Sequence, residues 1–187
     1  FKNHIELVDF DAFGYIWINN TKKSWLKGFE VESKKTINKK IELRANMTVV
    51  NSQSTFIKSF MRNDGSFVIG DTVSRTMFGQ APYIFNGIVS YTSDSLNMTL
   101  SLSYNVQGSR LVITGSYGLP DVYERPRHML DAKITKNFGK HFTLGCTIKD
   151  ILNAAVTRSY KLNDNWIKNY DIYHYGTSYN VSLAYKL

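Results

Sequence analysis

The chain has 187 residues, of which 43% are hydrophobic and 20% charged, so it suits one ordinary domain and its composition argues against disorder. A single cysteine excludes an internal disulfide framework, and three prolines exclude a collagen-like or proline-rich sequence. No run of about 18 apolar residues predicts a transmembrane helix, although membrane β-strands escape such a search. The net charge of +8 raises nucleic acid or an anionic membrane as a partner.

Alternation of apolar and polar residues dominates the chain, and helical periodicity is nearly absent. In segment 96–107 the alternation runs without an error. The pattern predicts the tail of one strand within residues 1–5, followed by strands at 24–35, 40–51, 82–92, 96–107, 127–136, 141–152 and 177–187. Most of these strands have the length of about 9–11 residues with which a tilted strand crosses a bilayer.

The connections between the predicted strands alternate in length. Tight turns are expected at 36–39, 93–95 and 137–140, and long loops at 52–81, 108–126 and 153–176. Outer-membrane barrels have short turns on the periplasmic side and long loops outside, so the alternation favours hairpins that point to two sides of a membrane. Structureless loops of about 25 residues also argue against an ordinary compact domain.

One face of the predicted sheet is apolar, and the other is rich in Ser, Thr and Asn. We expect the apolar face to meet lipid and the hydroxyl-rich face to meet water, whereas a soluble ligand-binding barrel would reverse the two. Aromatic residues near the strand ends favour the membrane orientation, because rings with a polar tip prefer the headgroup level. The lysines near the short turns, which we expect to contact lipid phosphates, are Lys34, Lys35, Lys39, Lys40, Lys136, Lys140 and Lys186.

Sequence motifs for chemistry are missing, so the chain is expected to be neither an enzyme nor a cofactor-binding protein. No basic helix is predicted that would enter a groove, so nucleic acid is not an expected partner. The histidines are scattered without metal-ligand spacing; they are His4, His128, His141 and His174. Cys146 falls on the apolar face and is expected to be buried or lipid-facing.

Ligand capture, if the chain performs it, is expected in the long loops. Their aromatic side chains have hydrogen-bonding neighbours, a combination that suits sugars or peptides. The candidate substrate-binding residues are Phe60, Trp166, Tyr170 and Tyr173. The alternative role for each of them is packing of one loop on another.

Several short segments occur in an order and spacing typical of one family. They are 1–6 (FKNHIE), 28–32 (GFEVE), 79–83 (GQAPY), 120–127 (PDVYERPR), 136–142 (KNFGKHF) and 149–153 (KDILN). Together they resemble the C-terminal barrel of TonB-dependent outer-membrane receptors, above all the SusC-like receptors of Bacteroidetes. The final strand, with Tyr185 and Leu187 spaced by two, resembles the membrane-insertion signal of outer-membrane proteins, although Phe is usual where Leu187 stands.

The resemblance implies that residues 1–187 are the last seven to eight strands of a larger, antiparallel transmembrane β-barrel in the cell outer membrane, without a plug domain. It implies a transport component for nutrient uptake. The implied partners are outer-membrane lipid, the remaining barrel and plug of the receptor, TonB through that plug, and a surface lipoprotein lid. The alternatives are a complete small outer-membrane barrel with a structural or adhesion role, and a soluble ligand-binding barrel. The transported substrate does not follow from the sequence.

Overall fold

The computed structural model describes residues 2, 4–9, 15–20, 23–61, 64–115, 120–162 and 165–186. Within these ranges all the regular secondary structure is β-strand, and all strand pairs are antiparallel. The strands form three sheets. The all-β antiparallel fold that the alternation predicts is therefore confirmed.

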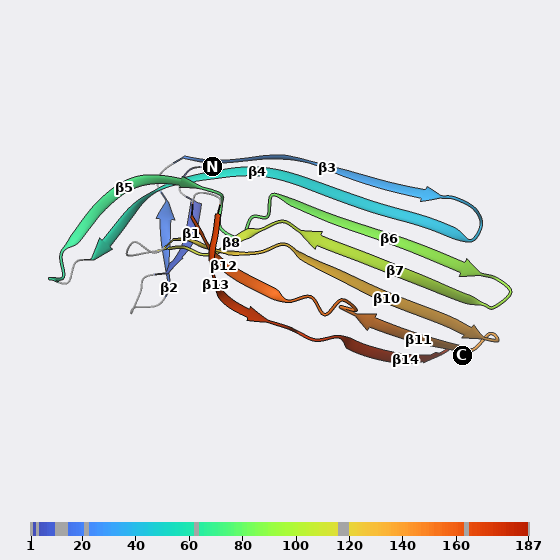
Figure 1. Cartoon of the computed structure of the whole chain (residues 1–187). Coiled ribbons are helices and arrows are strands. Elements are labelled where there is room, and N and C mark those ends of the chain that lie inside the picture. Colours follow the sequence, from blue (N-terminus) through green and yellow to red (C-terminus); the bar gives the residue numbers. More distant parts are fainter. Residues whose placement is uncertain are drawn as a thin grey trace.

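The main sheet has eight strands, most of which lie side by side in the order β14-β11-β10-β7-β6-β4-β3 (Figure 1). These are β3 (Ser24–Thr36), β4 (Ile41–Met61), β6 (Tyr83–Ser93), β7 (Met98–Gln107), β10 (Arg127–Phe138), β11 (Phe142–Lys149) and β14 (Ser178–Tyr185). They are the strands expected between residues 24 and 187, and their ends differ from the prediction by a few residues, except that β4 runs on to Met61.

The N-terminal strand of the structure differs more from the sequence prediction than the strands of the main sheet do. The structure has β1 (His4–Asp9) paired with β2 (Tyr15–Asn20) in a separate two-stranded sheet. A strand therefore begins close to where one was expected to end.

Three short turns join β3 to β4, β6 to β7, and β10 to β11, and all lie at one end of the main sheet together with the end of β14 (Figure 1). Asn97 and Gly139 take left-handed conformations in two of these turns, with φ of 47° and 63°. In the third, the Asn38 side chain accepts hydrogen bonds from the backbone nitrogens of Lys40 and Ile41 at 2.8 and 2.9 Å. The expected gathering of the short turns at one end is confirmed.

The long connections are mostly β-structure, which corrects the expectation of loops. Segment 52–81 holds the continuation of β4 and its partner β5 (Phe67–Arg75). The other two hold β8 (Arg110–Ile113), β9 (Val122–Glu124), β12 (Val156–Leu162) and β13 (Asn165–Tyr173), which form a sheet of order β13-β12-β9-β8. Register shifts interrupt the β4–β5, β8–β9 and β12–β13 pairs. Each shift changes which face a residue occupies, so alternation cannot reveal these strands.

Cross-strand register gathers the apolar side chains on one face of the main sheet. Leu100 of β7 lies between Tyr91 of β6 and Ile134 of β10, and Leu183 of β14 pairs with Leu144 of β11. Leu100 is 37% exposed and Leu183 70%. Other exposed residues on this face are Phe29, Val31, Met47, Val89, Leu102, Phe138, Phe142, Tyr179, Val181 and Tyr185. The apolar face is thus not the core of the described chain.

The buried apolar residues lie instead at the end of the sheet opposite the short turns. Leu111, Val122 and Val156 come from the four-stranded sheet, and Ala81 and Val106 come from the adjoining end of the main sheet. The core of the described residues is therefore small and local. An apolar surface as large as the exposed face of the main sheet is typical of a surface that meets lipid or a partner.

The main sheet is open along its two long sides. In the described part of the chain, β3 pairs only with β4 and β14 only with β11, so no strand pairing joins β3 to β14. The structure thus contains antiparallel strands of the expected kind but no closed barrel.

Candidate functional site

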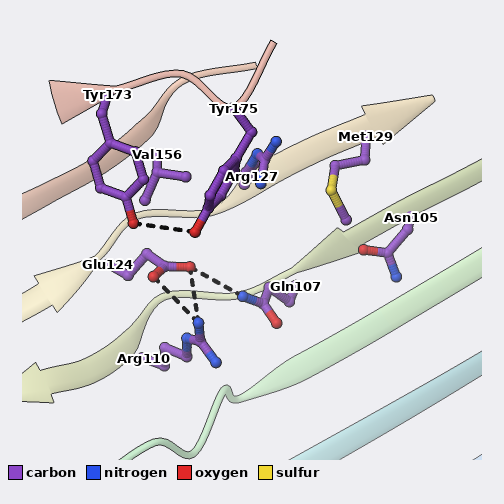
Figure 2. A pocket seen from close by; sticks show the side chains of 9 residues that line it. All are labelled: Asn105, Gln107, Arg110, Glu124, Arg127, Met129, Val156, Tyr173 and Tyr175. Atoms are coloured by element: carbon purple, nitrogen blue, oxygen red, sulfur yellow. Dashed lines mark hydrogen bonds and ion pairs between the residues drawn. The ribbon is translucent and has the colours of Figure 1, made fainter. Parts of the chain in front are cut away.

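A polar cavity of about 210 Å³ lies where the end of the main sheet opposite the short turns meets the four-stranded sheet (Figure 2). We call it the arginine–tyrosine pocket; it is lined by Asn105, Gln107, Arg110, Glu124, Arg127, Met129, Val156, Tyr173 and Tyr175. Gln107 pairs with Arg127 and Asn105 with Met129, so these four residues share the face of the sheet opposite Leu100. The pocket therefore lies on the hydroxyl-rich face.

Glu124 is the buried charge of the pocket, with a side chain that is 8% exposed. Its carboxylate accepts hydrogen bonds from Nη2 of Arg110, at 3.2 Å to each oxygen, and from Nε2 of Gln107 at 3.3 Å. A buried carboxylate is costly unless it is paired, so Arg110 holds the charge in place. The Nε of Arg110 is buried and has no hydrogen-bond partner among the described residues.

Arg127 forms the wall of the pocket beside Tyr175. It pairs with the carboxylate of Asp150, donates from Nε to the backbone oxygen of Ala154 at 3.1 Å, and lies over the Tyr175 ring at 5.2 Å. Asp150 itself has a positive φ of 53° and follows the last residue of β11. The end of β11 therefore fixes the position of a guanidinium that comes from β10.

Tyr173 and Tyr175 approach the pocket from the end of β13. Their rings meet edge to face at 5.4 Å, and their hydroxyl oxygens are 3.5 Å apart. Figure 2 shows both hydroxyls directed toward the side of the pocket where Glu124 lies, with Arg110 beyond it. The hydrogen bond with Tyr175, together with desolvation, raises the pKa of Tyr173 above its ordinary value of 10.0. Tyr173 is therefore a neutral donor near neutral pH.

The arrangement is able to bind a polar molecule. It offers amide, guanidinium and phenol groups for hydrogen bonds and two ring edges for contact, in a volume that equals roughly seven waters at about 30 Å³ each. No group of three or more His, Cys, Asp or Glu side chains is placed to hold a metal ion within the described ranges. The pocket thus suits a small polar solute or one unit of a larger one.

Of the predicted substrate-binding residues whose side chains the structure describes, only Tyr173 lines the pocket. Trp166 lies under the guanidinium of Arg125 at 4.8 Å, and Tyr170 meets Tyr160 edge to face at 5.8 Å. Both are therefore engaged in contacts within the four-stranded sheet. Phe60 belongs to β4, and its side chain lies outside the described part of the structure.

The predicted insertion signal is described only in part. Tyr185 is the last residue of β14, and its exposed ring contacts those of Phe142 at 4.9 Å and His141 at 5.8 Å. Leu187 lies outside the described residues. A role of these residues in membrane insertion stays a prediction.

The histidines take hydrogen-bonding roles where the structure describes their side chains. Nδ1 of His128 contacts the Tyr104 hydroxyl at 2.5 Å, and those of His141 and His174 contact the backbone oxygens of Lys186 and Asn153 at 3.0 and 2.8 Å. The side chain of His4 is not described. Cys146 is half-buried on the apolar face, as expected.

Sequence reasoning missed Arg110, Glu124, Arg127 and Asp150 as residues of a site. A signal was present in segment 120–127, where four charged residues of both signs lie within eight positions. Each of them has a partner elsewhere in the fold: Asp121 pairs with Arg75, Glu124 with Arg110, Arg127 with Asp150, and Arg125 with Ser159. Two of these pairs, Glu124 with Arg110 and Arg127 with Asp150, hold residues that line the pocket.

No protein-family model matches this chain, and neither a curated protein nor a solved structure shows significant similarity to it. The resemblance to TonB-dependent receptors therefore stays a prediction. The described ranges also contain no helix that has both the length and the apolar character needed to span a membrane.

Proposed function

We propose that the chain is a membrane-spanning part of an outer-membrane β-barrel that takes up nutrients, with its apolar face toward lipid and its hydroxyl-rich face toward a water-filled interior. The observation that carries this proposal is the exposed apolar face of the main sheet. A sheet exposed on this scale is stable in lipid and unfavourable in water, because each apolar Å² left in water forgoes about 25 cal/mol.

The height of the apolar face supports the proposal. Tyr83 and Tyr91 lie on this face of β6, eight residues apart, with Phe85, Gly87 and Val89 between them. At about 3.4 Å per residue this is about 27 Å along the strand, or about 21 Å across a membrane for a tilt of about 40°. The apolar band of outer-membrane barrels is about 25 Å tall and has aromatic residues at both borders.

The opposite face supports a watery interior. Asn46, Asn86 and Asn105 form a row of side-chain hydrogen bonds across β4, β6 and β7. Two rows further along this face, the hydroxyl oxygens of Ser90 and Ser101 are 3.0 Å apart. These bonds use only some of the donors and acceptors of the amide and hydroxyl groups. The others would be costly to place against hydrocarbon, whereas water satisfies them.

The pocket gives the interior a place to hold a polar solute. It lies on the hydroxyl-rich face at the end opposite the short turns, which is the outer end if those turns are periplasmic. Its ion pair joins the buried Glu124 to Arg110, whose side chain is 38% exposed. We propose that solutes entering from outside contact the pocket before they pass the rest of the sheet.

The exposure of the apolar face counts against a soluble ligand-binding barrel, because such a barrel buries its apolar side chains inside. The open sheet counts against a complete small barrel, since strands β3 and β14 do not pair with each other in the described residues. We therefore favour a sheet that is completed by further strands.

Cys146 allows a direct test, because it is the chain's only cysteine and lies on the apolar face between Ile134 and Val181. The protein as the cell makes it, with any cysteine outside these 187 residues replaced by serine, is labelled at Cys146 with a fluorescent maleimide and reconstituted in vesicles. We expect strong quenching by lipids that carry a quencher on the acyl chain and little quenching by iodide. In the matched variant Cys146→Ser/Thr147→Cys the label moves to the other face, so the two effects should exchange. Quenching by iodide alone at position 146 would overturn the membrane orientation.

Transport is tested separately in cells. A strain without the gene should lose growth when one class of nutrient is limiting, and the intact gene should restore it. Growth that is unaffected on every limiting nutrient would remove the transport part of the proposal and leave the membrane orientation standing.

A further inference from the structure

The unpaired positive charge of the main sheet gathers at the end with the short turns. In the described part of the chain, six lysines there have no carboxylate within salt-bridge distance: Lys35, Lys39, Lys40, Lys136, Lys140 and Lys186. We call them the short-turn lysines. The carboxylate of Glu42 at this end pairs with Lys34 at 3.2 Å and Arg44 at 2.6 Å. The carboxylate of Asp94 lies in the β6–β7 turn.

The opposite end of the molecule is arranged differently. Four arginines there pair with four carboxylates: Arg75 with Asp121, Arg110 with Glu124, Arg127 with Asp150, and Arg158 with Asp171. Much of the net charge of +8 therefore comes from the end with the short turns. In the proposed orientation this difference runs across the membrane, from one leaflet to the other.

Aromatic rings lie beside the short-turn lysines on the apolar face. Tyr91, Phe138, Phe142 and Tyr185 are all exposed. The ammonium group of Lys136 lies over the Phe138 ring at 5.4 Å. Rings of this kind prefer the headgroup region, and a lysine beside them can lay its stem along the apolar surface while its ammonium group reaches the phosphates.

We propose that the short-turn lysines and these rings bind the headgroups of anionic phospholipids in the leaflet that surrounds the short turns. This inference rests on the proposed membrane orientation. A zwitterionic headgroup carries its own cation, whereas an anionic headgroup leaves its phosphate for the protein. Each cation close to an anionic surface strengthens binding by about fivefold.

The rings favour lipid over an acidic protein or a nucleic acid as the partner. Phe138 and Phe142 continue the same apolar face that carries Leu100 and Ile134, so the lysines border a surface that is already assigned to hydrocarbon. A partner that bound only the charges would leave these rings exposed to water. A bilayer covers the rings and the charges together.

The test uses the reconstituted protein and two kinds of vesicle, one of phosphatidylcholine and one that also contains phosphatidylglycerol. Competition between the two kinds gives the preference for anionic lipid, and quenching of the Cys146 label by lipid reports insertion. Lys39→Gln/Lys140→Gln removes two exposed lysines of the turns. Lys133→Gln/Lys149→Gln removes two exposed lysines of the hydroxyl-rich face and is the matched control.

We expect the unaltered protein to prefer anionic vesicles, the turn variant to lose about 25-fold of that preference, and the control to keep it. High salt should reduce the preference of the unaltered protein, because it screens exposed charges. Insertion without any preference, or an equal loss in the control, would overturn this inference alone. Absence of lipid quenching in both kinds of vesicle would instead overturn the membrane orientation on which it rests. If the protein preferred anionic vesicles only after an acidic protein was added, this would also contradict anionic lipid as the partner of the short-turn lysines.

Discussion

Replacing Asp150 with asparagine removes one charge of a buried ion pair while keeping the turn that holds it. The side chains of Arg127 and Asp150 are 13% and 10% exposed. Asp150 also accepts a hydrogen bond from the backbone nitrogen of Ala154 at 3.3 Å, and its own nitrogen donates to Asp131 at 2.9 Å. Asparagine tolerates the positive φ of 53° and keeps an oxygen for Ala154, so the substitution removes the charge and the acceptor that face Arg127 and leaves the turn in place.

The expected cost follows from what Arg127 retains. Removing one partner of a buried ion pair costs about 3–5 kcal/mol. Arg127 keeps its bond to the oxygen of Ala154 and its place over the Tyr175 ring, so the lower end applies. A loss of about 3 kcal/mol lowers the folding equilibrium constant by roughly 150-fold.

The measurement is reversible urea unfolding of the protein in detergent micelles or vesicles, followed by tryptophan emission. Asp94→Asn is the control, because this exposed turn carboxylate has no side-chain partner among the described residues; it should change stability by less than about 0.5 kcal/mol. In the double variant Arg127→Met/Asp150→Asn neither charge is left unpaired, so much of the loss should be recovered. A cost for Asp150→Asn as small as that of the control, or simple additivity in the double variant, would show that the pair does not hold this end of the sheet.

Three further predictions use the same unfolding measurement. Gly28→Ala should destabilise the protein by about 1–3 kcal/mol, because its Cβ would lie 2.3 Å from the backbone oxygen of Val49 and the β3–β4 pair would have to shift; an unchanged midpoint would contradict this packing. Leu102→Arg on the apolar face should cost about 2–4 kcal/mol in vesicles, whereas Ser101→Arg on the opposite face should cost far less; equal costs would speak against a lipid-facing side. The raised pKa of Tyr173 stabilises the fold fully below pH ~10 and loses this effect as the pH rises through the folded pKa. Tyr173→Phe should therefore differ less from the unaltered protein at pH ~11 than at pH ~9, and a constant difference would refute the assignment.

The strands of the main sheet were predictable because each of them keeps one environment on each side. In β7, from Met98 to Gln107, apolar residues stay on one face and polar residues on the other along the whole strand. The short turns followed from the same pattern, since the alternation stops for only a few residues at each of them. Strict alternation therefore survives wherever a strand keeps its apolar and polar residues separated on its two faces.

The strands at the other end were missed because they lack that separation. Leu111 and Val122 are buried between elements, and the β8–β9 pair shifts register between Leu111 and Ile113. The pocket was missed for a related reason. Its charged pairs join residues that lie far apart in sequence, as Arg127 and Asp150 do, and spacing carries no signal for such pairs. The aromatic residues Trp166 and Tyr170 were visible in the sequence, but the fold engages them with Arg125 and Tyr160.

The two ends of the sheet carry different cations, arginine at one and mostly lysine at the other, and the chemistry of the two side chains accounts for this difference. Arginine presents a planar fork that matches a carboxylate, so it suits fixed and partly buried pairs such as Arg110 with Glu124. Lysine is a flexible point charge that keeps its hydration, so it suits a border where the partner is not fixed in position. The same difference between arginine and lysine is seen near the short turns. Arg44 there pairs with Glu42, whereas Lys39 and Lys140 have no carboxylate partner in the described structure. The four arginines at one end thus pair with carboxylates of the chain itself, whereas the short-turn lysines have no carboxylate partner in the described structure, and the partner that we propose for them is anionic lipid.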